Sequence, residues 1–154
     1  MKKTLLTALL PLALIATPAL AADVPGMIAK ASPHSASETL DRLENALEAN
    51  DIGVALRWDH AAKADGVDIE LGPTELLMFG NPALGSHLFT SQQTAGIDLP
   101  MKALAWTDAD GQTWLAYNDP EWMAERHGIE DRDDILDTMS NALDNLTNAA
   151  IAED

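Results

Sequence analysis

The chain has 154 residues, of which 25 are acidic and 9 are lysine or arginine, and 47% of its residues are hydrophobic. This length and apolar content predict one compact folded domain rather than a disordered or fibrous chain. The net charge of -16 argues against nucleic acid and anionic membranes as partners, because binding to either depends on clustered basic side chains. The chain has no cysteine, which excludes disulfides, thiol redox chemistry and thiolate metal sites.

Residues 1–21 have the pattern of a secretory signal peptide. Lys2 and Lys3 precede a short apolar stretch, and Ala19 and Ala21 place small residues where a signal peptidase cleaves. We expect cleavage after Ala21, which would leave residues 22–154 as a single domain with its core at about residues 27–150. The predicted location is the bacterial periplasm or the medium, with no membrane attachment after cleavage.

The first half of the remaining chain predicts a strand, a helix and a second strand. Residues 27–29 form a short apolar piece, and Ser35 with Glu38 matches a helix capping box. The residues after this box place leucines on one helical face. Residues 52–60 alternate with a period of two, which predicts a strand with one shared face: Ile52, Val54, Leu56, Trp58 and His60.

The second half predicts three strands and three helices. The apolar run 76–79 is typical of a strand covered on both faces, and Asn81-Pro82 is a helix start. Residues 101–107 and 112–117 predict a hairpin through Asp110-Gly111. A short helix should run from Pro120 to His127 and end at Gly128. The last helix should bury one stripe: Ile135, Leu136, Met139, Leu143 and Leu146.

Together these elements predict an α+β fold in which an antiparallel sheet of four to five strands carries two main helices on one face. Four ordered stretches also resemble the signature motifs of the family called domain of unknown function 302: residues 59–62, 73–82, 99–102 and 117–120. The resemblance implies a curved antiparallel sheet of the TATA-box-binding-protein-like grouping. It implies no activity, because the family is named for lacking one and a fold alone does not establish function.

His60 is the most interesting candidate for chemistry, because imidazole can act as acid, base or metal ligand near neutral pH. Lys102 shares strand parity with apolar residues and could receive an anion, and Tyr117 lies on the neighbouring strand of the predicted hairpin. A ligand site formed by His60, Glu75, Lys102 and Tyr117, with Asn81 at a helix start, is therefore a hypothesis. The alternatives are a hydrogen-bonded histidine at the end of the sheet and a lysine that only reaches solvent.

The leading functional hypothesis is an exported binding or accessory module for a small polar or anionic ligand. The alternatives are an exported enzyme that uses His60 as its general acid or base, a subunit that binds a protein partner, and a copper binder that uses methionines and histidines. No pair of histidines has metal-binding spacing, so the sequence predicts neither a metal site nor a cofactor. The sequence does not determine the oligomeric state.

Overall fold

The computed structural model describes residues 24–153, so the predicted signal peptide lies outside the described residues. The strands form one antiparallel sheet in the order β1-β5-β4-β3-β2. Their bounds are Met27–Ser32 for β1, Gly53–Asp59 for β2, Thr74–Gly80 for β3, Met101–Thr107 for β4 and Thr113–Asn118 for β5.

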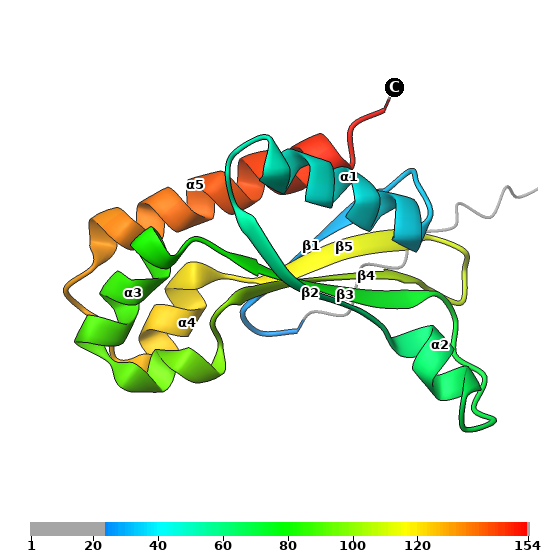
Figure 1. The fold of residues 1–154 in the computed structure, drawn as a ribbon, viewed down its shortest axis with the longest axis horizontal. Coiled ribbons are helices and arrows are strands. Elements are labelled where there is room, and N and C mark those ends of the chain that lie inside the picture. The colour runs from blue at the N-terminus through cyan, green and yellow to red at the C-terminus, as the bar shows by residue number, and fades with distance from the viewer. Residues whose placement is uncertain (1–23, 154) are drawn as a thin grey trace, which may run out of the picture.

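The helices cover one face and both ends of this sheet. Figure 1 shows α1 and α5 side by side over one face, α3 and α4 near one end, and α2 projecting from the other end. This arrangement confirms the predicted α+β fold with two main helices on one face. The helix bounds are Ala36–Glu48 for α1, His60–Asp65 for α2, Pro82–Ser91 for α3, Gln93–Ile97 for the 3-10 helix η1, Pro120–His127 for α4 and Asp133–Ala150 for α5.

The helix ends follow the signals in the sequence. The Ser35 hydroxyl accepts a hydrogen bond from the backbone N–H of Glu38 (3.2 Å), as the predicted capping box requires. The Asp119 carboxylate caps α4, and Gly128 ends that helix with a φ of 67°, in the left-handed region that glycine tolerates. These local side-chain contacts satisfy backbone groups that have no partner inside the helix.

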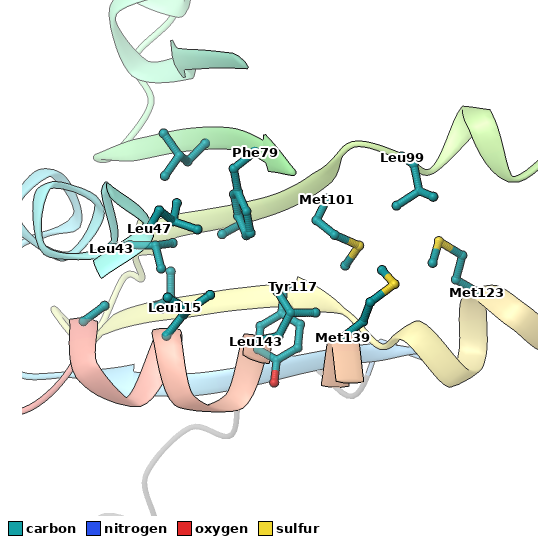
Figure 2. Packing of buried hydrophobic residues seen from close by; sticks show 14 of the residues in the cluster. Leu43, Leu47, Phe79, Leu99, Met101, Leu115, Tyr117, Met123, Met139 and Leu143 are labelled. Carbon is teal, nitrogen blue, oxygen red and sulfur yellow. The ribbon is translucent and has the colours of Figure 1, made fainter. Parts of the chain in front are cut away.

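The main core lies between the sheet and the two long helices. The leucines of α1 interlock with alternate residues of the strands, and the predicted stripe of α5 is buried except for the partly exposed Ile135. Figure 2 shows this layer, with β5 side chains meeting the leucine and methionine side chains of α5. The most deeply buried large apolar side chains are Leu40, Leu43, Leu47, Leu77, Leu88, Leu115, Met123 and Leu136.

Two strand predictions were wrong in detail. In β3, Leu77 and Phe79 are buried whereas Leu76 and Met78 are partly exposed, so only one face of this strand is covered by helices. In β2, a bulge between Val54 and Leu56 interrupts the alternation.

The bulge moves residues of β2 to different faces of the sheet. Val54 pairs with Phe79 on the helix-covered face, whereas Leu56 pairs with Met78 on the opposite face. His60 does not continue the strand, because the Asp59 carboxylate accepts a hydrogen bond from the N–H of Ala62 (2.8 Å) and starts α2 there. The five residues that were expected to share a face therefore do not share one.

Candidate ligand-binding site

The residues predicted to form a polar site do not converge. His60 is exposed at the start of α2, next to the end of the β2–β3 ladder where Asp59 pairs with Glu75. Ala103 is the β4 partner of Tyr117, so Lys102, one position earlier in β4, lies on the opposite face from Tyr117. The Lys102 ammonium donates to the backbone carbonyls of Asp98 (2.9 Å) and Pro100 (3.2 Å).

Glu75 belongs to an ion-pair network instead of facing His60. The Arg57 guanidinium contacts its carboxylate at 2.8 Å and also bonds to Asp41 and Glu44 of α1. Partial burial lowers the pKa of Arg57, but the hydrogen bonds with Asp41 and Glu75 outweigh burial and raise that pKa. This network ties β2 and β3 to α1.

Tyr117 is buried in the core and close to a second polar cluster between β1 and α5. The Lys30 ammonium lies 6.0 Å from the Tyr117 ring centroid and donates to Asp144 Oδ1 (2.7 Å) and Thr147 Oγ1 (2.8 Å). Burial first, and then the charge of Asp144, raise the pKa of Tyr117. Tyr117 therefore belongs to the buried core beside the Lys30 cluster and not to an exposed polar site.

A cavity of about 470 Å³ opens at the end of the sheet where α3 crosses toward α5. Of the predicted site residues, only Asn81 lines it, and the Asn81 side chain caps α3 by accepting from the N–H of Ala83 (2.9 Å). The cavity walls are largely apolar side chains from four parts of the chain: Ile52, Val54, Phe79, Leu84, Phe89, Leu99, Met101, Met139, Leu143 and Leu146.

The cavity is suited to apolar ligands, and its walls can adapt to ligands of different shape. Figure 2 shows Met101 of β4 and Met139 of α5 pointing toward each other at this end of the core. Methionine side chains are flexible and polarizable, so they adjust to ligands of different outline. Gly85 also lines the cavity, and a Cβ built on it would meet no heavy atom within 4 Å. The absence of a side chain at this position therefore keeps space open beside α3.

Sequence analysis missed most of this site. The sequence placed Met139 in the buried stripe of the last helix and offered methionines as copper ligands, but it did not indicate that Met101 and Met139 line an apolar cavity. The available signal was Gly85-Ser86, which places two small residues between the large apolar residues Leu84 and Leu88 of α3. Small residues on a helix facing a long leucine stripe indicate incomplete packing.

A second cluster has the composition of acid–base machinery. His127 Nε2 lies 2.7 Å from Asp98 Oδ2, and His127 Nδ1 lies 3.1 Å from the Thr94 hydroxyl. A hydroxyl, an imidazole and a carboxylate in such contact also occur in nucleophilic hydrolases. However, Thr94 and His127 line neither the apolar cavity nor a second, more polar one near Trp122. The two hydrogen bonds of His127 link the end of α4 to η1 and to Asp98, the residue after η1.

Residues 24–153 contain neither a metal-ligand cluster nor a membrane-spanning helix. In this part of the chain, no group of three or more histidines, aspartates and glutamates is placed to hold a metal ion. No helix there combines the length and the apolar composition needed to cross a membrane.

Comparisons with known proteins agree with the fold. The sequence model of the family "Domain of unknown function DUF302" matches residues 28–146. A crystal structure of an uncharacterized conserved DUF302 protein from Bacillus stearothermophilus superimposes with a TM-score of 0.74 at 17% identity. The superposition covers 82% of this chain and 99% of that chain, so nearly the whole of that protein is this one fold.

The chain also resembles part of two longer curated proteins. It is 42% identical over 104 residues to "Fluoride-specific ion channel FluC 1" of Brucella suis and to the protein of the same name of Brucella abortus. The match covers 68% of this chain in both cases, and 41% and 38% of the two channel proteins. The chain therefore corresponds to about two fifths of the length of these relatives.

Proposed function

The chain belongs to the DUF302 family, and we propose that it is a binding module whose ligand occupies the apolar cavity between α3 and α5. The observation that carries this proposal is the cavity itself. Its volume falls within the range of roughly 300–1,000 Å³ that is typical of small-molecule sites. Strands and helices form most of its walls, so the site exists before the ligand arrives and needs little ordering on binding.

The cavity favours a ligand that is mainly apolar. Burial of apolar ligand surface contributes about 25 cal/mol per Å² removed from water. A phosphate, sulfate or small carboxylate would lose its hydration there without gaining a basic partner, because no lysine, arginine or histidine lines the cavity. Neither Lys102 nor His60 lines the cavity. The anionic ligand therefore remains a prediction that rests on Lys102, and the acid–base role remains a prediction that rests on His60.

Filling the cavity tests the proposal. The probe is N-phenyl-1-naphthylamine, a neutral apolar fluorophore whose emission rises when it leaves water. Gly85→Leu should place a side chain in the cavity and weaken probe binding at least about tenfold. Ala83→Leu is the matched control, because it adds a larger side chain at an exposed position of the same helix and should bind like the parent.

Either of two results would refute the cavity as the binding site. One is a parent protein that does not bind the probe, and the other is equal binding by the parent and Gly85→Leu. Circular dichroism and the unfolding temperature of each variant establish that the fold is kept, so that weaker binding cannot be confused with unfolding.

Export remains part of the proposal, supported by the Lys2-Lys3 start and the small residues at Ala19 and Ala21. The intact mass of protein recovered from the periplasm of a bacterial host should correspond to residues 22–154. Recovery of the uncleaved chain from the cytoplasm alone would contradict this part.

A second candidate function is an accessory module of a membrane channel, and the 42% identity with the Brucella channel proteins supports it. The domain would then modulate the channel when joined to it, or from outside as a separate chain. Fluoride efflux from vesicles should change when Brucella suis FluC 1 loses its matched segment, and adding this chain should reverse part of the change. Identical efflux in all three preparations would eliminate this candidate.

A further inference from the structure

The cavity is lined by one charged residue, which is acidic. Asp51 is the one charged side chain among the residues that line the cavity, and Asn81 and Ser86 are the polar side chains there. Asp51 is exposed to solvent while its neighbour Ile52 is partly buried against the core. Asp51 therefore lies where the apolar space meets water.

From this placement we infer that the cavity selects amphiphiles with a positively charged head group. The apolar tail occupies the space between α3 and α5, and the head pairs with Asp51 at the solvent side. This inference rests on the proposed function and names the ligand class of that same site. A fatty-acid carboxylate would instead meet a like charge in a chain whose net charge is already -16.

The backbone holds Asp51 firmly in this position. Asp51 has a φ of 55° and donates its N–H to the carbonyl of Glu48 (3.1 Å), in the turn that joins α1 to β2. The next N–H, of Ile52, donates to the carbonyl of Leu47 (3.0 Å). Two consecutive hydrogen bonds to the end of α1 therefore hold the backbone from which the Asp51 side chain extends.

The expected discrimination is moderate because Asp51 is exposed. Ion pairs at exposed positions change affinity by about two- to fivefold. Attraction of a cationic head and repulsion of an anionic head act together, so two amphiphiles with the same tail and opposite heads should differ by about tenfold at low salt. The difference should shrink as salt is added.

The experiment measures displacement of N-phenyl-1-naphthylamine from the full chain by three amphiphiles below their micelle concentrations: decyltrimethylammonium, decanol and decyl sulfate. Asp51→Asn removes the charge and keeps the backbone, because asparagine tolerates a positive φ. Asp68→Asn is the matched control, since Asp68 also has a positive φ (58°) but is not among the lining residues. Both variants change the net charge equally.

We expect the parent and Asp68→Asn to prefer decyltrimethylammonium over decyl sulfate by about tenfold, and Asp51→Asn to reduce this preference to about threefold or less. Decanol should displace the probe equally from all three proteins. Equal preference in Asp51→Asn and Asp68→Asn would overturn the inference, because only the overall charge would then matter. Failure of the probe and of decanol to bind any of the proteins would instead refute the proposed function.

Discussion

Helix α5 packs against two neighbours with different results. Against α1 it closes a core in which Leu40, Leu43 and Leu47 are fully buried, whereas its contact with α3 is more limited and leaves the apolar cavity. The leucines of α1 repeat at helical spacing, but α3 carries Gly85-Ser86 where large side chains would complete the contact. The apolar stripe of α5 therefore closes a sealed core or leaves an open cavity according to the size of the side chains that face it.

Truncation of one leucine in each region should show most clearly that the α1–α5 core is more tightly packed than the α3–α5 contact. Leu43→Ala should lower the free energy of unfolding by about 4 kcal/mol, because the sealed core cannot collapse around the space. Leu143→Ala, at the cavity wall, should cost about 2 kcal/mol, because fewer neighbouring atoms lose contacts there. Urea unfolding of both variants measures the difference. Equal losses would mean that the two regions are packed alike.

A second difference between the two regions is the ion-pair network of Arg57, which lies beside α1 in the sealed region. Arg57→Met keeps most of the volume but leaves Glu75 and Asp41 without their cation, so it should cost about 2 kcal/mol of unfolding free energy. Lys63→Met is the control, because Lys63 only stacks over the Trp58 ring at 5.0 Å and should change stability by less than about 1 kcal/mol. A similar small change in both variants would show that the Arg57 network contributes little.

The smallest expected effect is a pH dependence at the other polar contact of the sealed region. The hydrogen bond from Lys30 lowers the pKa of Asp144 below its ordinary value in the folded protein. A carboxyl with a lowered pKa in the folded state stabilises the protein above its ordinary pKa, and this contribution disappears as the pH falls through the folded pKa.

The unfolding temperature of the parent should therefore fall as the pH is lowered from about 5 to about 3, and Asp144→Asn should make this fall shallower. Asp137→Asn removes an exposed acid from the same helix and should follow the parent curve. A parent-like acid curve for Asp144→Asn would argue against the Lys30 contact as a source of stability.

Local sequence signals predicted the fold well, and the candidate site poorly. The caps at Ser35 and Asp119 and the hairpin at Gly111 could be predicted because neighbouring residues determine them. The cavity could not, because it depends on how α3 meets α5, and 41 residues separate the end of α3 at Ser91 from the start of α5 at Asp133. His60 was placed by continuing the strand alternation past Asp59, where β2 ends. Lys102 and Tyr117 were placed together without knowledge of the register, which pairs Tyr117 with Ala103 and so turns Lys102 to the opposite face.

The bulge in β2 also bears on how such domains diverge. It allows Val54 to face the cavity while Leu56 and Trp58 remain on the other side of the sheet. Gain or loss of one residue at that point would exchange the side chain that faces the cavity and leave the other strand pairs in place. Single-codon insertions or deletions at this sheet edge would thus change the lining of the cavity in relatives without rebuilding the scaffold.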